Sequence, residues 1–295
     1  MQAMILAAGL GTRLLPHTSI RPKPLFPILN TPLLLLTIER LKNFGFDHII
    51  VNCHHLREQI VAVLGSYQGV VVIEEEKILG TGGGLRGALP LMKDEPILVT
   101  NGDIYHTVNL LEFYNYHSRN KHRITLAMHD FPRFNTVAMN GDTVDVFAEN
   151  KTLPQLAYTG LQVVEPDLLQ DIEEGKSSCI VDHYRKLLVR GVQIDTLRVD
   201  GCHWTDMGTV DDYLALHEGL LSGKIPCWRE AGEVRKPYCI ATRAKLSPHV
   251  ELKDWVSIGE ARIGDKTRLQ RCVVWDNIVV HAGKEIRDTI VSADV

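Results

Sequence analysis

The sequence predicts an α/β fold with a mostly parallel sheet, followed by a short β-helical tail. Up to about Ser222, short apolar segments alternate with amphipathic ones, and this alternation is typical of parallel sheets with right-handed crossovers. Beyond Pro237 the helical period disappears and apolar residues recur every six positions, which is the spacing expected of a β-helix. The length of 295 residues suits one large domain with a smaller appendage.

The elements of the large domain follow from these patterns in chain order. A short uninterrupted apolar run indicates a strand covered on both faces, and an apolar stripe of helical period indicates a helix. Strands are predicted at residues 3–7, 49–52, 70–73, 97–100, 124–128, 144–147, 158–164 and 194–199. Helices are predicted at residues 32–43, 56–64, 83–91, 110–120, 180–190 and 210–221. Ligands of such a sheet bind beyond the carboxyl ends of its strands.

A composition break at residues 222–226 separates two predicted domains, residues 1–223 and residues 237–295. In the second domain, three series of apolar residues carry the six-residue spacing. They are Ala244, Val250 and Val256; Ile263 and Leu269; and Val274, Val280 and Ile286. Because a free β-helix edge favours aggregation, we expect the tail to pack on the first domain or on another subunit. An irregular β-rich tail with chance spacing is the alternative interpretation.

The composition narrows the function classes. The formal net charge of −4, with 45% hydrophobic and 23% charged residues, is typical of a soluble globular protein and argues against a nucleic-acid binder, which carries a strongly basic face. The six cysteines are scattered with no C-x-x-C pair, which favours reduced thiols in the cytoplasm over disulfides or zinc. No basic segment precedes the first apolar run, and residues 32–36 are too few to span a membrane, so we expect neither a signal peptide nor membrane insertion.

The first two dozen residues predict a phosphate-binding loop. The first predicted strand runs into Gly9 and Gly11, and Arg13 and Lys23 follow. Glycines allow positive φ and a close approach of backbone N–H groups, which together form an anion-binding concavity. The two cationic side chains add full charges beside it. A structural turn next to surface basic residues is the alternative, since most Gly-x-Gly pairs only shape turns.

Two aspartates predict a magnesium site at the same edge of the sheet. Asp103 follows the strand at residues 97–100, and Asp206 lies between the strand at residues 194–199 and a helix. Mg²⁺ prefers oxygen ligands and usually takes one or two carboxylates, with waters and substrate phosphates completing its shell. For each aspartate taken alone, the alternative is an N-cap, which is the commoner role before a helix.

Together these motifs resemble the signature of the sugar-1-phosphate nucleotidyltransferases. The matching N-terminal string is Leu6-Ala7-Ala8-Gly9-Leu10-Gly11-Thr12-Arg13-Leu14, with Pro16, Thr18 and Pro22-Lys23-Pro24. Asn101-Gly102-Asp103 and Thr205-Asp206-Met207-Gly208-Thr209 are similar to the two metal-binding motifs of the family. The resemblance implies a Rossmann-like nucleotidyltransferase domain, Mg²⁺ held by Asp103 and Asp206, and a short left-handed β-helix as the tail.

The resemblance also implies the binding residues. Nucleotide contacts are expected from Leu6, Ala8, Gly9, Gly11, Thr12, Arg13, Lys23, Thr81 and Gly82. Acceptor contacts are expected from Asn101, Glu149, Lys151, Thr159 and Gly160. Thr81 and Gly82 lie in the glycine-rich residues 79–85, where missing side chains would let a nucleobase lie flat against the backbone. A flexible helix N-terminus is the alternative there.

The implied reaction joins a nucleoside triphosphate to a sugar 1-phosphate and releases pyrophosphate. The acceptor phosphate would attack the α-phosphorus in line, so the protein needs no covalent nucleophile and acts by positioning and charge, with Arg13 and Lys23 as catalytic residues. Residues 81–84, 88–91 and 99–103 are similar to N-acetylmuramate 1-phosphate uridylyltransferases, and residues 273–277 to mannose-1-phosphate guanylyltransferases, so base and sugar stay open. The alternative is a catalytically silent regulatory subunit that binds a nucleotide sugar. The tail is a candidate surface for a homo-oligomer.

Overall fold

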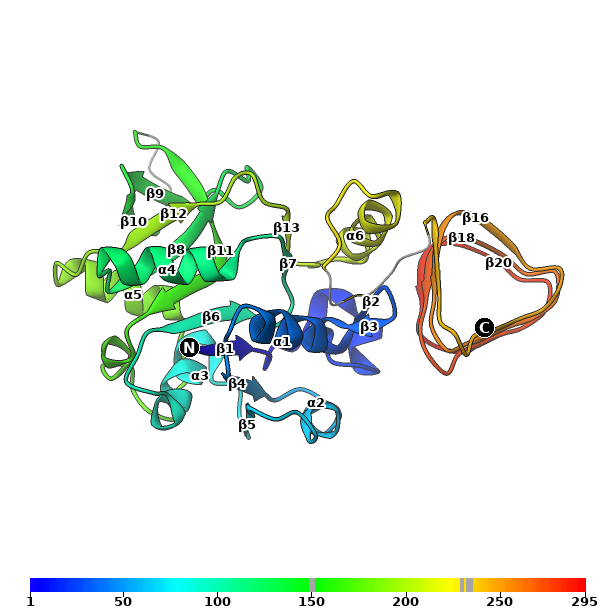
Figure 1. Cartoon of the computed structure of the whole chain (residues 1–295), viewed down its shortest axis with the longest axis horizontal. Helices are drawn as coiled ribbons and strands as arrows, with labels where there is room; N and C mark the ends of the chain where they lie inside the picture. Colours follow the sequence, from blue (N-terminus) through cyan, green and yellow to red (C-terminus); the bar gives the residue numbers. More distant parts are fainter. Residues whose placement is uncertain (149–151, 229–230, 232–235) are drawn as a thin grey trace. The chain divides into compact units, whose positions relative to one another are not determined.

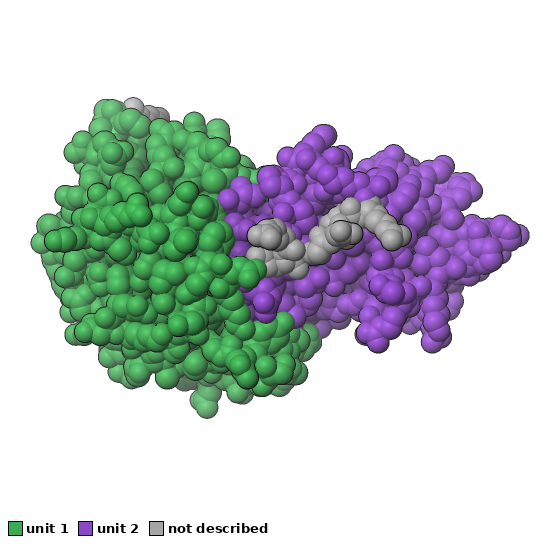
Figure 2. Space-filling model, in the orientation of Figure 1, with its two compact units in different colours: residues 1–10, 41–102, 108–204 green, residues 11–40, 103–107, 205–295 purple. Residues whose placement is uncertain are grey.

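The computed structural model describes residues 1–148, 152–228, 231 and 236–295 (Figure 1). Within these ranges the chain divides into two compact units, each assembled from segments that are distant in the sequence (Figure 2). Unit 1 contains residues 1–10, 41–102 and 108–204, and unit 2 contains residues 11–40, 103–107 and 205–295. These units cut the chain at other places than the predicted domains, residues 1–223 and 237–295, which stay a prediction.

The described part of unit 1 is built on a nine-stranded sheet. Its strands, in spatial order, are β5 (Val70–Glu74), β4 (His48–Cys53), β1 (Gln2–Leu6), β6 (Ile97–Asn101), β11 (Gln155–Val164), β8 (Ile124–His129), β12 (Asp195–Arg198), β10 (Thr143–Val146) and β9 (Val137–Asn140). β1 pairs in parallel with β4 and β6, β4 pairs in parallel with β5, and β8 pairs in parallel with β12. β11 runs antiparallel between β6 and β8. The predicted α/β class is confirmed, and the sheet is parallel from β5 to β6, as predicted, but mixed from β11 onward, where antiparallel pairs occur.

Six strands of this sheet run in one direction: β1, β4, β5, β6, β8 and β12. Their carboxyl ends therefore share one edge, at which β11 begins because it runs the opposite way. Asn101 ends β6 and His129 ends β8 at this edge. The loop after Leu6 leaves β1 there as well. Ligands of open α/β sheets bind at this edge.

The helices of the described residues lie close to their predicted positions. They are α1 (Leu33–Asn43), α2 (Arg57–Leu64), α3 (Gly80–Ala88), α4 (Leu110–Asn120), α5 (Ile180–Val189) and α6 (Val210–Ser222). The side chain of Asn109 caps α4 and that of Thr209 caps α6, each accepting from a backbone N–H of the first turn. Within the described ranges, no helix is both long and apolar enough to cross a membrane.

Several short elements were not predicted. They are the 3₁₀ helices η1 (Thr12–Leu14), η2 (His17–Ser19), η3 (Lys23–Leu25), η4 (Leu89–Leu91) and η5 (Pro166–Leu169), and the strands β2 (Pro27–Ile28), β3 (Thr31–Pro32), β7 (Tyr105–His106) and β13 (Trp204–Thr205). Two to four residues carry no periodic pattern, so hydrophobic spacing does not reveal these elements. Three of these turns, η1 to η3, lie in the segment between Gly11 and Phe26.

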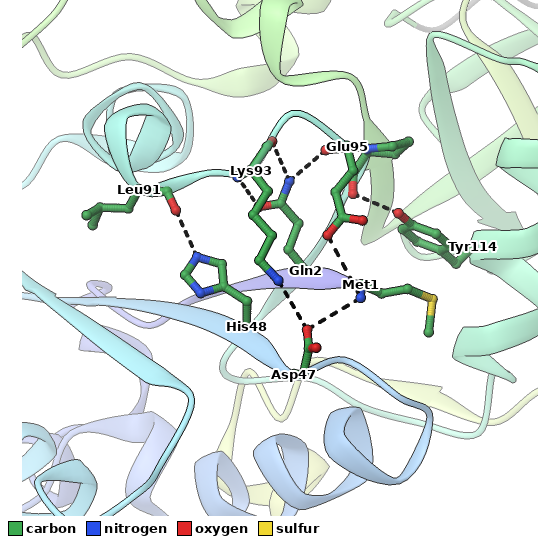
Figure 3. A network of polar contacts seen from close by, with 9 residues as sticks. Met1, Gln2, Asp47, His48, Leu91, Lys93, Glu95 and Tyr114 are labelled. Atoms are coloured by element: carbon green, nitrogen blue, oxygen red, sulfur yellow. Dashed lines mark hydrogen bonds and ion pairs between the residues drawn. The ribbon is translucent and has the colours of Figure 1, made fainter.

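A buried glutamine fixes the opposite edge of the unit 1 sheet. Gln2 is fully buried, and Figure 3 shows its amide bonding the loop that leads into β6. Its Nε2 donates to the carbonyl oxygens of Lys93 (2.9 Å) and Glu95 (2.6 Å), and its Oε1 accepts from the Lys93 N–H (2.8 Å). The Tyr114 hydroxyl donates to the next carbonyl, that of Pro96 (3.0 Å). These bonds hold the start of β6 against β1 and so set where Asn101 emerges.

The tail in unit 2 is a stack of parallel strands. β14 (Tyr238–Ile240), β16 (Glu251–Ile258), β18 (Arg268–Val274) and β20 (Glu285–Val291) form one sheet, and β15 (Lys245–Leu246), β17 (Arg262–Ile263) and β19 (Val279–Val280) form another. Glu251 pairs with Arg268 and Arg268 with Glu285, so one coil takes 17 residues. The coils follow a nearly triangular path in Figure 1. This arrangement is consistent with the predicted β-helix.

The coil is one residue shorter than three hexapeptides, so the predicted six-residue series fits only in part. Its central members are buried inside the tail, whereas Ala244, Val250 and Ile286 are half-buried. The coil length also varies: Tyr238 pairs with Val256, 18 positions on, and beyond a register shift between Lys253 and Val256 that residue pairs with Cys272, 16 positions on. One corner is turned by a residue of positive φ in each of three coils, namely Asp254 (57°), Arg271 (46°) and Asp288 (52°).

Candidate active site

Four charged side chains come together in unit 2. Lys23 Nζ donates to Asp103 Oδ2 (2.7 Å) and to the backbone carbonyl oxygen of Asp206 (2.7 Å). Arg13 Nη2 donates to Asp206 Oδ2 (3.2 Å). The four residues come from three segments of unit 2 that are far apart in the sequence. The structure thus places the two predicted cationic residues against the two predicted metal-binding aspartates.

Burial differs sharply among the four side chains. The Lys23 side chain is 6% exposed, whereas those of Asp103 and Asp206 are 33% and 19% exposed. A buried ammonium group is costly unless it is paired and hydrogen-bonded, and the two oxygen acceptors meet that need. Lys23 is therefore a fixed charge, and the carboxylates remain open to solvent on their other side. Arg13 is 57% exposed and has freedom to move.

The loop around Asp206 is shaped to let Arg13 approach. Asp206 Oδ1 accepts from the Gly208 N–H (3.1 Å), and Met207 between them is fully buried with φ of 45°. A Cβ on Gly208 would lie 2.4 Å from Arg13 Nη1 and 2.8 Å from Asp206 Oδ2. Glycine is required here because a side chain would occupy the place of the guanidinium group. A positive φ at a non-glycine residue often marks a functional site.

The predicted phosphate loop begins with a left-handed glycine. Gly11 has φ of 63°, and its carbonyl oxygen accepts from the Leu14 N–H (2.9 Å) and from the Thr18 hydroxyl (3.2 Å). The bond from Leu14 belongs to η1, in which Thr12 and Arg13 are exposed to solvent, and the bond from Thr18 ties η2 to Gly11. In unit 1, the preceding Gly9 is also exposed.

Asp103 is followed by a strand that a buried tryptophan holds. Trp228 stacks on Tyr105 with ring centroids 4.4 Å apart, its Nε1 donates to the His106 carbonyl (2.7 Å), and its N–H donates to the Tyr105 hydroxyl (3.0 Å). Burial lowers the pKa of His106 to about 3, so this imidazole is neutral at physiological pH. Because β7 is held in this way, it fixes the position of Asp103, which lies two residues before it.

In unit 1, a buried network that the sequence did not reveal holds the chain where it leaves β1, ahead of the predicted phosphate loop. Asn52 Oδ1 accepts from the Ala7 N–H (3.0 Å), and Asn52 Nδ2 donates to Glu75 Oε1 (2.6 Å). Glu75 Oε2 accepts from the Leu79 N–H (3.1 Å) at the start of α3. Asn52 and Glu75 are 1% and 4% exposed. Polar residues that interrupt or directly follow apolar strands were the available signal. Leu6, next to this network, accepts at its carbonyl from the Gly102 N–H (2.8 Å), and Ala8 is buried.

The glycine-rich start of α3 packs closely on the segment before α5. Thr81 Oγ1 accepts from the Ile180 N–H (2.9 Å), and the Gly82 N–H donates to the Ser178 carbonyl (2.9 Å). A Cβ on Gly83 would lie 2.4 Å from the Lys176 carbonyl oxygen. This packing explains why the helix begins at Gly80 rather than at residue 83, since tertiary contacts override weak helix propensity. The nucleobase role of Thr81 and Gly82 stays a prediction.

The predicted acceptor residues that the structure describes lie at the ligand edge of the sheet. Asn101 ends β6, and Thr159 and Gly160 (φ 81°) lie in an irregularity of β11 between Tyr158 and Gln162. Thr159 Oγ1 donates to the Ala127 carbonyl (2.8 Å) and accepts from the Leu161 N–H (3.2 Å), so its hydroxyl is already engaged. Glu149 and Lys151 lie outside the described residues.

An aromatic cluster lies beside Thr159 and was missed by the sequence reasoning. The rings of His129, Phe131 and Phe134 stack in a row, with successive centroids 5.3 and 5.5 Å apart, and Trp204 meets all three edge to face. Trp204 Nε1 donates to the Thr159 carbonyl (2.9 Å). Phe131, Phe134 and Trp204 are only half-buried. Aromatic residues scattered over 76 positions give no sequence pattern.

Asp103 and Asp206 are a two-carboxylate set. Among the residues that the structure describes, no group of three or more His, Cys, Asp or Glu side chains is placed to hold a metal ion. Two carboxylates suffice for Mg²⁺, because waters and substrate phosphates usually complete its shell. The chemistry of the donors therefore fits this ion better than one that needs an all-protein site.

Comparison with known proteins identifies relatives. A model of the nucleotidyl transferase family matches residues 2–223. The mannose-1-phosphate guanylyltransferase of Mycobacterium tuberculosis is 29% identical over 295 residues, which cover 96% of this chain and 82% of that protein. The N-acetylmuramate alpha-1-phosphate uridylyltransferase of Neisseria meningitidis is 31% identical over 227 residues, which cover 71% of this chain and 94% of that protein.

Solved structures share the fold. The crystal structure of a Bacillus anthracis protein in complex with sucrose has a TM-score of 0.67 and 20% sequence identity, and the match covers 78% of this chain and 98% of that one. At this identity the likeness supports the fold alone.

Proposed function

The chain belongs to the nucleotidyl transferase family, and we propose that it transfers a nucleoside monophosphate from a nucleoside triphosphate to a sugar 1-phosphate. The observation that carries this proposal is the grouping of Arg13, Lys23, Asp103 and Asp206, two cations against two partly exposed carboxylates. Such a grouping suits a substrate that brings several phosphates and a divalent cation. The sugar 1-phosphate is proposed because both relatives above are named for acceptors of that kind.

In the proposed reaction, an oxygen of the acceptor phosphate forms a bond to the α-phosphorus. The bond from that phosphorus to the oxygen leading to the β-phosphate breaks, and pyrophosphate leaves with the electron pair. The protein contributes no atom to this exchange, so its part is position and charge. Lys23 offers a charge at a fixed place, while the exposed Arg13 is free to turn from Asp206 to the leaving phosphates.

Mg²⁺ is the proposed cofactor, and Asp103 and Asp206 are the residues that would hold it. When bound, the ion would neutralise phosphate charge and bridge phosphate oxygens. Lys23 fixes one oxygen of Asp103 and the backbone carbonyl of Asp206. This leaves the second oxygen of Asp103 for the ion. Asp206 Oδ1 accepts from the Gly208 N–H, so Asp206 Oδ2 would become available once Arg13 turns away from it.

The substrate contacts are proposed on two sides. Leu6, Ala8, Gly9, Gly11, Thr12, Thr81 and Gly82 are proposed on the nucleotide side, and Asn101, Glu149, Lys151, Thr159 and Gly160 on the acceptor side. The hydroxyl of Thr159 is engaged by backbone groups, so Thr159 would shape the acceptor side rather than bond the sugar. The half-exposed rings of Phe131, Phe134 and Trp204 suit the apolar face of a sugar ring. We leave the base and the sugar open between the activities named for the two relatives.

Two features of the tail are also proposals. The three-sided coil supports a β-helix, and its left-handed sense is proposed because the family resemblance implies it. The parallel strands at its end support a homo-oligomer, because an exposed strand edge pairs readily with another chain.

The test is a substrate panel. The full chain is incubated with Mg²⁺, each common nucleoside triphosphate and a set of sugar 1-phosphates, and both pyrophosphate and nucleotide sugar are measured. The proposal expects one pair to give equal amounts of the two products. If every pair fails while isothermal titration detects a bound nucleotide sugar, the protein is the silent regulatory subunit instead.

A further inference from the structure

The segment that carries the two cationic residues packs on the tail within unit 2. Between Arg13 and Lys23 the chain forms only short 3₁₀ turns, whose hydrogen bonds are weak. Trp275 of the tail is 1% exposed and lies against three side chains of this segment. They are Arg21, whose guanidinium carbon is 4.7 Å from the ring centroid, Phe26 at 4.8 Å and His17 at 6.0 Å between centroids.

Two further coils of the tail contact the same part of the chain. His17 Nδ1 and the Ser292 hydroxyl are 2.7 Å apart. Asn30 Nδ2 donates to the Ile258 carbonyl (2.9 Å), and Asn30 Oδ1 accepts from the Ser257 hydroxyl (3.0 Å). These contacts make the tail part of the support for residues 17–30.

The contacts lie along one line of the tail. Ile258, Val274 and Val291 are stacked in register in successive coils. Ser257 precedes the first of them, and Trp275 and Ser292 directly follow the other two. We call Ser257, Trp275 and Ser292 the supporting edge. Strand pairing joins successive coils at this edge, whereas residues 12–25 form only 3₁₀ turns, so we expect the edge to be the more rigid of the two.

We propose that the supporting edge positions residues 12–26, which carry Arg13 and Lys23. Trp275 is then a positioning residue for these two side chains. The inference rests on the proposed function for its effect on catalysis, and it gives the tail a part in catalysis beyond assembly. Arg21 is two residues from Lys23, and His17 is four residues from Arg13, so a shift of either moves a cationic residue. Misplacement of catalytic groups by about 1 Å can cost on the order of 100-fold in rate.

The test compares Trp275→Leu with Leu269→Ala in the full chain. Leu269 is as buried as Trp275 and belongs to the same core, so it controls for a weakened tail. Amide hydrogen exchange is measured on peptides covering residues 12–26. We expect faster exchange there in Trp275→Leu and wild-type exchange there in Leu269→Ala. Unchanged exchange in Trp275→Leu, or an equal rise in both variants, overturns the proposal.

Kinetics give the second readout. For the productive substrate pair, Trp275→Leu is expected to lower kcat about 10- to 100-fold and to raise the KM for the triphosphate, with the KM for the acceptor unchanged. An equal rise of both KM values in this variant, or no change in either KM, contradicts a positioning role. Trp275→Phe keeps a ring against Phe26 and is expected to give a smaller shift of the same kind, so it replaces Trp275→Leu if that variant fails to fold. Hydrogen exchange needs no substrate, so failure of the proposed function and failure of this inference are distinguishable.

Discussion

Gly208→Ala should disturb the contact between Arg13 and Asp206 without destabilising the fold. The added Cβ would lie 2.4 Å from Arg13 Nη1, well inside van der Waals contact. Because Arg13 is 57% exposed, its flexible end can swing away from Asp206 into solvent, and nothing in the backbone at Gly208 resists alanine. We therefore expect the variant to fold and to lose the contact between Arg13 and Asp206.

The expected change in the free energy of unfolding is several-fold smaller than the expected loss of transition-state stabilisation. An ion pair with so exposed a partner contributes about 0–1 kcal/mol to the free energy of unfolding, and replacing glycine by alanine offsets about 0.4–1 kcal/mol by restricting the unfolded chain. The net change in stability is therefore close to zero. In contrast, removing one well-placed donor from a transition state costs about 3–4 kcal/mol, or 100- to 1,000-fold in kcat.

The assay measures kcat and KM for Gly208→Ala, Arg13→Ala and the double variant. Because both changes remove the contact between Arg13 and Asp206, their losses in the double variant should be well below additive. Any loss beyond that of Arg13→Ala measures the shift that the Cβ, 2.8 Å from Asp206 Oδ2, imposes on that carboxylate. Gly201→Ala is the matched control, since a Cβ there meets nothing within 4 Å. Additive losses in the double variant, or wild-type activity of Gly208→Ala, would refute the reasoning.

Three further changes have defined outcomes. Lys23→Met keeps most of the length of the buried side chain but removes its charge, so kcat should fall by about 100-fold or more while circular dichroism stays native. Near-normal turnover would count against the proposed mechanism. Phe134→Ala removes a half-exposed ring of the aromatic cluster and should raise the KM for the sugar 1-phosphate several-fold, with the KM for the triphosphate unchanged. A change in the KM for the triphosphate alone would contradict a role of the cluster in binding the sugar. Burial lowers the pKa of His217 from 6.5 to about 4, so the unfolded chain binds this proton first as the pH falls; stability is full above pH 6.5 and decreases by about 3 kcal/mol towards pH 4. Urea denaturation of His217→Gln at pH 7 and pH 4.5 should show a smaller loss than the wild type, and an identical loss in both would assign the acid sensitivity to other groups.

The sequence predicted those elements whose apolar residues follow a regular spacing. Apolar runs such as residues 97–100 and 124–128 located the buried strands, and the helical stripe of residues 110–120 located α4 to the residue. Strand β9 was missed because its four residues lack a distinguishing pattern. The tail was recognised from its spacing, but its coils of 16 to 18 residues depart from a strict six-residue repeat, and spacing alone does not contain that variation.

The candidate site was predictable only where charge and chain position suffice. Lys23 and Asp103 were selected as isolated residues, and the structure joins them at 2.7 Å. The link between Asn52 and Glu75 was not foreseeable, because it depends on how strands β4 and β5 lie beside each other. The packing of Trp275 on the N-terminal segment was equally hidden, since more than 200 positions separate the two in the chain.

The stereochemical course at the α-phosphorus tests the central claim most directly. The productive triphosphate is supplied with one sulfur of known configuration on its α-phosphate, and the nucleotide sugar formed is analysed by phosphorus NMR. The account predicts inversion, because the acceptor phosphate attacks in line in a single displacement. Retention would mean two displacements through a covalent intermediate on the protein, and the proposed division of work between substrate and protein would then be wrong.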